Sequence, residues 1–241
     1  MIVMPQGPPP WPALIIIHPV TGLEEMMQQR ARDYAQAGYL AVAPDVYAGD
    51  AGYAVHEPKN IERAAHIWLE RDDAKREAHL GHFEPAVRER IFAAHEWIIG
   101  RNTAGYIDVV AACFAEVRAR ADVTEIGCIG YCMGGRLSGE LAASGAAIDA
   151  AVIFYGGAPK AEAIPNIRCP MQGHYAVTDS GITSRAYEFA LAMHAAGKSF
   201  DYSVYNADHG FGEPVADVYE PHAARLATGR ANAFLAEHLK R

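Results

Sequence analysis

Residues 125–135 read EIGCIGYCMGG, an apolar run that ends among glycines. The part from Glu125 to Gly130 predicts a buried β-strand, and a helical pattern of apolar and charged residues begins directly after Gly135. A strand that enters a helix through Gly-x-Cys-x-Gly is typical of a nucleophile elbow, in which the central residue occupies a strained turn. Glycines are needed two residues to either side, because side chains there would collide. The pattern predicts an α/β fold with Cys132 as its nucleophile.

The predicted position of Cys132 also explains how its thiol would be activated. At the N-terminus of a helix, the helix dipole and the unpaired N–H groups favour a thiolate. The N–H of Met133 would point to the same place and is predicted to be one donor to an oxyanion. Most free cysteines are small buried hydrophobic residues instead, and this interpretation suits the three others, which are Cys113, Cys128 and Cys169.

The rest of the chain alternates between short apolar runs and segments with helical periodicity. A helix is predicted over about residues 24–36, and further strands are predicted at Leu14–Ile17, Tyr39–Ala43, Ala150–Tyr155, Cys169–His174 and Phe200–Tyr205. Residues 7–12 (GPPPWP) are predicted to be a lead-in outside any helix or interior strand, because prolines lack backbone donors. Apolar strands separated by helices indicate a mostly parallel sheet that is covered on both faces. We predict a single α/β-hydrolase domain over residues 1–241.

Residues 47–97 interrupt this alternation. They contain many charged residues and no convincing strand, and both Trp68 and Trp97 lie within helical patterns. An excursion of this kind in an α/β fold is typical of a helical cover over the sheet or over the mouth of a site. A solvated pair of helices with no catalytic role is an equally good interpretation, and the sequence leaves both open.

Composition and charge restrict the partners of the protein. The 241 residues are 51% hydrophobic, which is enough for a large core. The net charge is −8 and the acidic residues are spread along the chain, which argues against nucleic acid as a partner. The longest apolar run is far shorter than a membrane helix, and four cysteines without a paired CxxC pattern favour a reducing, cytoplasmic setting. We expect no membrane partner, and a monomer or a small homo-oligomer.

Asp179 and His209 have the positions expected for the partners of the nucleophile. In α/β-hydrolases the acid and then the base follow the nucleophile, each on a loop after a later strand. Asp179 follows the strand predicted at Cys169–His174, and His209 follows the strand predicted at Phe200–Tyr205. The other histidines precede the nucleophile, lie in helical patterns or, like His174, end a strand. We predict a triad of Cys132, His209 as the base and Asp179 as the acid.

Four segments resemble motifs of the dienelactone hydrolase family. Residues 130–135 (GYCMGG) are similar to the nucleophile motif of that family, and residues 173–179 (GHYAVTD) to its acid loop. Residues 209–211 (HGF) resemble its histidine loop, and residues 43–47 (APDVY) the segment after its fourth strand. The similarity extends from about Leu14 to the C-terminus.

The resemblance implies hydrolysis of a small-molecule ester or lactone through an acyl-cysteine intermediate. It implies no metal and no organic cofactor. By the same resemblance, the second N–H of the oxyanion hole belongs to Val20. The residues beside the nucleophile and the base, Tyr131 and Phe211, become candidates for substrate binding.

This sequence departs from the family pattern at two positions that bear on the substrate. The best-known family members carry a glutamate that interacts with the resting thiol, and the matching position in this chain is Pro19. Glu24 or Glu25 could take over that part, although acids at a helix start also complement its dipole. Family members also carry an arginine that holds a substrate carboxylate, where this chain has Glu213, and Arg63 is the candidate for a second arginine of that site. We therefore expect a substrate other than the anionic dienelactone.

The N-terminus departs as well, because the family usually opens with a two-stranded hairpin. Only Met1 to Met4 could form such a strand here. We predict a shortened hairpin, with Pro8 to Pro12 at the edge of the sheet.

Two other functions fit the same cysteine. An exposed thiolate is sensitive to peroxide, so Cys132 could be a redox thiol, although Cys128 is predicted to lie within a strand and so could not act as a resolving cysteine. An α/β-hydrolase scaffold can also serve only for binding, since a fold alone does not define a function. Reactivity of Cys132 with iodoacetamide separates an active thiolate from such a scaffold.

Overall fold

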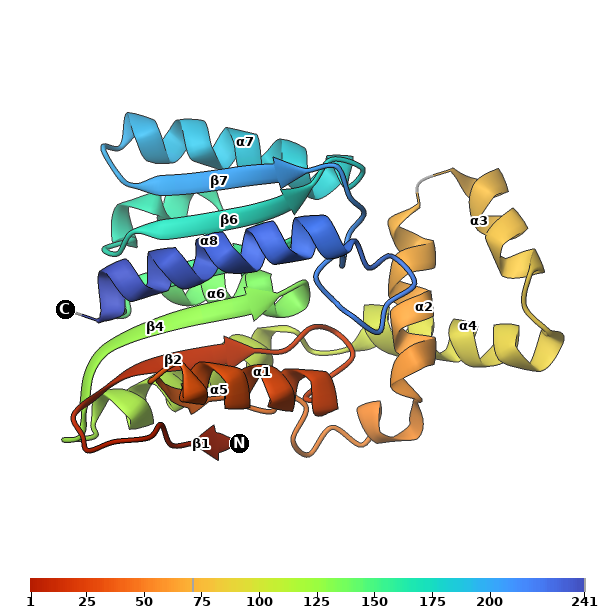
Figure 1. Ribbon diagram of the computed structural model, residues 1–241. Helices are drawn as coiled ribbons and strands as arrows, with labels where there is room; N and C mark the ends of the chain where they lie inside the picture. Colours follow the sequence, from red (N-terminus) through yellow and green to blue (C-terminus); the bar gives the residue numbers. More distant parts are fainter. Residues whose placement is uncertain (71, 241) are drawn as a thin grey trace.

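A computed structural model describes residues 1–70 and 72–240, and these form one sheet surrounded by helices (Figure 1). The strands are β1 (Ile2–Val3), β2 (Trp11–Ile17), β3 (Leu40–Val42), β4 (Val123–Tyr131), β5 (Ala150–Phe154), β6 (Met171–Ala176) and β7 (Phe200–Tyr205). Their order in the sheet is β1-β3-β2-β4-β5-β6-β7. β1 runs antiparallel to β3, and all other neighbours are parallel. The predicted mostly parallel α/β fold is confirmed.

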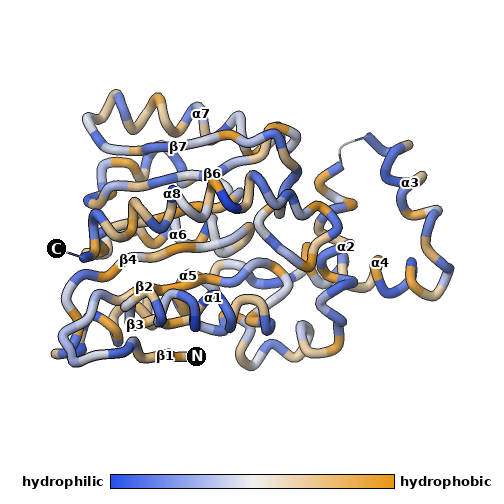
Figure 2. Tube along the Cα trace, in the orientation of Figure 1, coloured by the Kyte–Doolittle hydropathy of each residue, from blue (hydrophilic) through white to orange (hydrophobic). Residues whose placement is uncertain are grey.

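Helices cover both faces of this sheet. The α-helices of the described residues are α1 (Glu25–Gln36), α2 (Pro58–Leu69), α3 (Asp73–Gly81), α4 (Pro85–Gly100), α5 (Ala104–Arg118), α6 (Met133–Ala143), α7 (Ser180–Ala195) and α8 (Pro221–Leu239), and all but α2, α3 and α4 cover a face of the sheet. α1 and α8 lie in front of the sheet in Figure 1, whereas α5, α6 and α7 pack on the opposite face. Figure 2 shows hydrophobic and hydrophilic residues intermixed along α1 and α8, as expected for helices with one face on a core.

The buried side chains form two hydrophobic cores, one on each face of the sheet, and the interior strand β2 contributes to both. Its side chains alternate between the faces, so that Leu14 and Ile16 pack with α1 and α8. Ile15 and Ile17 pack on the other face, with residues of α5 and α6. All four side chains are fully buried. A continuous apolar run is what a parallel strand covered on both faces requires.

The N-terminal segment corrects two details of the prediction. Trp11 and Pro12 belong to β2 rather than to a lead-in, and the register with β4 shifts between Trp11 and Ala13. Pairing with β3 starts only at Ala13. Pro12, which has no N–H to donate, therefore precedes the regular hydrogen-bonding ladder between these strands. The edge of the sheet is formed by β1 and not by residues 8–12.

Helices α2, α3 and α4 occupy the excursion and project beyond the carboxyl ends of the strands (Figure 1). In parallel α/β sheets, ligands bind outside these carboxyl ends. The loops after β4, β6 and β7 reach the same end of the sheet, so the excursion lies beside the predicted site. Within the described part of the chain, no helix combines the length and apolar character of a membrane span.

Candidate active site

The turn between β4 and α6 holds Cys132 in a conformation that few residues other than glycine adopt. The φ angle of Cys132 is 53°. A Cβ atom on Gly130 would lie 1.9 Å from the carbonyl oxygen of Gly134, and one on Gly134 would lie 2.2 Å from the carbonyl oxygen of Ile17. The predicted need for glycine on both sides of Cys132 is confirmed. The elbow therefore presses directly against the end of β2.

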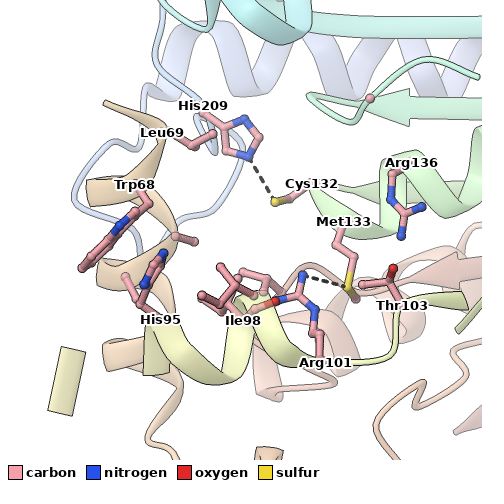
Figure 3. Close-up of a pocket in the computed structure, with 15 residues that line it drawn as sticks. Trp68, Leu69, His95, Ile98, Arg101, Thr103, Cys132, Met133, Arg136 and His209 are labelled. Carbon is pink, nitrogen blue, oxygen red and sulfur yellow. Dashed lines mark hydrogen bonds between the residues drawn. The ribbon is translucent and has the colours of Figure 1, made fainter. Parts of the chain in front are cut away.

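The structure brings together the three residues that the sequence predicts as a triad. His209 Nε2 lies 3.1 Å from Cys132 Sγ, and the two side chains point toward one another in Figure 3. On the other side of the ring, Nδ1–H donates to Asp179 Oδ2 at 2.6 Å. The side chains of His209 and Asp179 are only 9% and 7% exposed. The carboxylate and the sulfur thus contact opposite nitrogens of one buried imidazole.

Cys132 and His209 shift one another's pKa in the directions that favour a charged pair. Burial raises the pKa of the Cys132 thiol, but the charge and hydrogen bond of His209 and the N–H groups of Met133 and Val20 outweigh it, so the net pKa is lowered. Burial lowers the pKa of His209, but the sulfur and the hydrogen bond to Asp179 outweigh it, so the net pKa is raised. Both shifts favour a thiolate beside an imidazolium ion.

This pair predicts the pH dependence of alkylation. Because alkylation requires the thiolate, the rate of Cys132 with iodoacetamide should rise at a pH below that of an ordinary thiol and then stay level. His209→Gln should move this rise to higher pH. Burial raises the pKa of the thiol, and the charge and hydrogen bond of His209 would no longer oppose this effect. Burial raises the pKa of Cys113 to about 11 and those of Cys128 and Cys169 to about 12, so these three serve as internal controls. Labelling of these controls in preference to Cys132 at pH 7, measured by peptide mass spectrometry, would contradict the assignment.

Two backbone N–H groups, those of Met133 and Val20, point at the sulfur of Cys132. They are the two donors that the sequence and the family resemblance predict for an oxyanion. Met133 begins α6, so its N–H is free of the helical ladder. Val20 lies in the loop after β2, on the opposite side of the elbow. An oxygen bonded to the carbon that Cys132 attacks would find both donors in reach.

The loop that carries Val20 is held by side chains that sequence reasoning missed. His18 is fully buried; its Nδ1–H donates to the Pro19 carbonyl at 2.7 Å, and its Nε2 accepts from the Val46 N–H at 3.1 Å. Burial lowers the pKa of His18, in keeping with a neutral ring that both donates and accepts. The hydroxyl of Tyr47 donates to the Val20 carbonyl at 3.0 Å. The sequence signal that could have indicated this role is the position of His18 directly after the predicted strand Leu14–Ile17.

Two cavities meet at Cys132, His209 and Val20. The first, here called the apolar cavity, has a volume of about 430 Å³ and lies between α2 and α4 (Figure 3). Its walls include Trp68, Leu69, Ile98 and Ile99, with Arg101 and Arg136 at one side. The second, here called the acidic cavity, has a volume of about 330 Å³, and its lining includes Glu24, Glu57, Glu62 and Glu213. The excursion thus lines the mouth of the site, as one of its two interpretations expects.

Of the substrate-binding candidates, only Glu213 lines one of these cavities. Tyr131 is 1% exposed, and the Arg30 guanidinium lies 4.0 Å from its ring centroid. As the last residue of β4, Tyr131 points its side chain into the core beneath α1, away from the elbow surface. Phe211 is fully buried, with its ring 5.2 Å from that of Tyr155. Tyr131 and Phe211 therefore belong to the core that underlies the site and do not contact the space of either cavity.

Of the candidates for binding a carboxylate or priming the thiol, which are Arg63, Glu24 and Glu25, only Glu24 lines one of the cavities. Arg63 lies with its guanidinium 5.0 Å from the ring of Phe83, which is in the segment between α3 and α4, and does not line either cavity. Glu25 is exposed and forms an ion pair with Arg32. Glu24 does line the acidic cavity, beside Pro19. His174 is buried between Tyr205 and Gln172, as predicted for a structural residue.

Arg30 and Tyr155 are further residues that the sequence did not indicate. The hydroxyl of Tyr155 donates to Glu213 Oε1 at 2.6 Å, and Arg30 donates to the carbonyl of Gly212 at 2.5 Å. Arg30 also lies 3.7 Å from Glu213 Oε2. The ring of Tyr155 stands edge-on to His209, with 5.3 Å between centroids. These contacts tie the histidine loop to α1 and β5.

No group of three His, Cys, Asp or Glu side chains among the described residues has the arrangement needed to hold a metal ion. The other cysteines are also free, and the sulfur of Cys128 lies 3.0 Å from the hydroxyl of Ser138 inside the core. At Cys132 the structure holds a thiolate beside an imidazolium ion, with two N–H donors close to the sulfur.

Comparisons with known proteins agree with this geometry. The model of the dienelactone hydrolase family matches residues 1–239. A carboxymethylenebutenolidase from Pseudomonas putida is 27% identical over 233 residues, which cover 94% of this chain and 86% of that protein. A relative from Methylorubrum extorquens is 26% identical over 220 residues, which cover 86% of this chain but only 66% of that protein.

Solved structures show the same fold. One from Klebsiella pneumoniae, provisionally described as a dienelactone hydrolase, aligns with a TM-score of 0.70 at 22% identity and covers 97% of this chain and 90% of that chain. At this identity the similarity concerns the fold alone. The match to the family model, by contrast, spans nearly every residue, including the elbow and the loops of Asp179 and His209. The chain belongs to the dienelactone hydrolase family of ester and lactone hydrolases.

Proposed function

We propose that this protein hydrolyses a small-molecule ester or lactone through an acyl-cysteine intermediate, with Cys132, His209 and Asp179 as its catalytic triad. The observation that carries the proposal is the contact of Cys132 Sγ with His209 Nε2 at 3.1 Å, while Nδ1 of the same ring donates to Asp179. A nucleophile, a base and a group that orients the base are the three parts that covalent acyl transfer requires.

The reaction proceeds in two halves. The thiolate of Cys132 attacks the carbonyl carbon, and the oxygen that becomes negative accepts hydrogen bonds from the N–H groups of Met133 and Val20. When this intermediate collapses, the C–O bond to the alcohol breaks, and the departing oxygen takes the proton from His209 Nε2. A thioester remains on Cys132, and the ring of His209 is neutral.

The second half removes the acyl group. Neutral His209 accepts a proton from water as the water oxygen attacks the thioester carbonyl, and the same two N–H groups again hold the oxyanion. Collapse breaks the C–S bond, so the acid leaves and the thiolate returns beside the imidazolium ion. Esters and lactones suit this scheme better than amides, because the thiolate is a better leaving group than an amine and would be expelled first.

The glutamates that line the acidic cavity support a substrate other than the anionic dienelactone. A carboxylate on the substrate needs a cation to hold it, and the position of the family arginine is occupied by Glu213. Three further glutamates line the same cavity. A substrate anion in this cavity would therefore be repelled, which supports an ester or lactone without a carboxylate on that side.

The acyl-cysteine can be tested directly by mass spectrometry. Incubation with p-nitrophenyl acetate, followed by an acid quench and proteolysis, should give an acetyl group on the peptide that carries Cys132. His209→Gln should form this adduct more slowly at early time points, since the thiol then loses the partner that favours the thiolate. Cys113, which is half-buried on α5, serves as the internal control for nonspecific acetylation. Release of nitrophenol with the acyl group on another residue, or release that persists at an unchanged rate in Cys132→Ala, would refute the mechanism.

A further inference from the structure

The acidic cavity has more carboxylates than cations to match them. Four carboxylates line it, namely those of Glu24, Glu57, Glu62 and Glu213. Lys59 is the one lysine or arginine among the lining residues, and it is shared, because its ammonium lies 2.9 Å from Glu62 and 3.5 Å from Asp217. His66, which also lines the cavity, adds no charge at neutral pH, since burial lowers its pKa to about 4. The cavity is thus negative at the side of the nucleophile.

Glu213 is the most deeply buried of these carboxylates. The residue is 8% exposed. Its Oε1 accepts from Tyr155, but its Oε2 has no hydrogen-bond partner and lies 3.7 Å from Arg30. A buried acceptor without a donor is costly, so it marks a place where a ligand donor or a cation would stabilise the protein.

Glu24 provides a second, independent indication. Burial raises the pKa of Glu24, and the negative charges of Glu62 and Glu213 raise it further. No described lysine or arginine forms an ion pair with it. The charges of the Cys132 thiolate and the His209 imidazolium ion cancel, so even with Arg30 counted beside Lys59, four carboxylates face two cations. Charges held together in this way at a partly desolvated wall attract a positive group more strongly than charges in open water.

The apolar cavity has the opposite character. Besides Cys132 and His209, its charged lining residues are Arg101 and Arg136, of which Arg136 is ion-paired with Glu140, and the rest of its wall is largely aliphatic and aromatic. Both cavities open on Cys132, so a substrate with its carbonyl at the sulfur would extend into each of them. A positively charged group would be repelled from the first and attracted to the second.

We propose that the substrate is a cationic ester, with an alkylammonium group in the acidic cavity and an uncharged apolar group in the apolar cavity. This inference rests on the proposed function, since it assumes that the scissile carbonyl lies at Cys132. Glu24 and Glu213 determine the specificity for charge. Glu213, at the position where the family resemblance implies an arginine, would thereby reverse the charge that the site selects.

Matched esters that differ only in charge test the proposal. Acetylcholine is compared with its uncharged carbon isostere, neohexyl acetate, to place the charge in the alcohol. The p-nitrophenyl ester of trimethylammoniobutyrate is compared with the ester of its carbon isostere, to place the charge in the acyl group. In at least one pair, kcat/KM should be about 10-fold higher for the cation, and this ratio should fall as ionic strength rises.

Variants connect the preference to the cavity. Glu24→Gln should lower the ratio of cationic to neutral kcat/KM by about 3-fold or more, because it removes one unpaired charge. Glu188→Gln, on the exposed face of α7, is the matched control and should leave the ratio unchanged. A ratio near one in both ester pairs, or a preference that Glu24→Gln does not alter, would overturn the inference.

The same assays separate this inference from the proposed function. If the neutral esters are turned over and Cys132→Ala abolishes that turnover, the acyl-cysteine mechanism stands whatever the charge preference. Turnover that persists in Cys132→Ala would instead defeat the mechanism itself, independently of the ratios. A Cys132-dependent activity with no preference for the cation would remove the inference alone.

Discussion

Cys132→Ala is expected to lower kcat/KM for p-nitrophenyl acetate by about 10³-fold or more. The variant removes the atom that attacks the carbonyl, while His209 and the N–H groups of Met133 and Val20 remain. These groups retain some ability to bind the ester and to activate water, so a small residual rate is expected. The loss should appear in kcat as well as in kcat/KM, because the thiolate acts in the reaction rather than in ground-state binding.

The control for this prediction is Cys113→Ala. Cys113 lies on α5, half-buried and away from both cavities, so its loss should change the rate less than 2-fold or so. Circular dichroism and thermal unfolding of Cys132→Ala should match the parent protein, which would exclude misfolding as the cause. A rate for Cys132→Ala within a factor of ten of the parent would exclude Cys132 as the nucleophile.

Gly134→Ala is expected to lower the free energy of unfolding by about 3 kcal/mol or more, a large effect for one methyl group. The added Cβ would lie 2.2 Å from the carbonyl oxygen of Ile17 and 2.6 Å from that of His18. Both are backbone atoms at the end of the central strand β2, so neither can rotate away. Relief of the clash requires the elbow to move off β2, which would also displace Cys132 from His209.

The matched control is Gly229→Ala on the exposed face of α8. A Cβ atom there meets nothing within 4 Å, so the change should stabilise the helix by about 0.5–1 kcal/mol. Urea denaturation of both variants measures the difference. A Gly134→Ala protein as stable as the parent would show that the elbow does not pack on β2 as described.

The strands and the elbow could be predicted because their signals are local. An apolar run such as Leu14–Ile17 is compatible with few structures other than a strand buried on both faces, and β7 was predicted with its observed ends, Phe200–Tyr205. The extension of β2 to Trp11 could not be predicted in this way. Whether a proline is tolerated depends on the register of the neighbouring strand, which the residues around it do not specify.

The roles of the residues beside the elbow required the tertiary structure. Tyr131 and Phe211 adjoin the predicted triad in sequence, yet both point into the core. His18 and Tyr47 were not predicted as residues of the site, yet they hold the loop of Val20 through hydrogen bonds. The direction of a side chain follows from the strand or turn that carries it, so neighbours in sequence can face opposite ways.

By itself, the sequence determined the fold class, the elbow at Cys132 and the order of Asp179 and His209. Each of these depends on residue types and on their spacing and order along the chain. Only the tertiary structure decided the shape and the charge of the site. Glu213 lies close to Arg30 and Glu24, which are far from it in the sequence. Residues of α2 line the cavity that these glutamates share with the nucleophile. Electrostatic interactions depend on distance in space, which the spacing of residues along the chain does not contain.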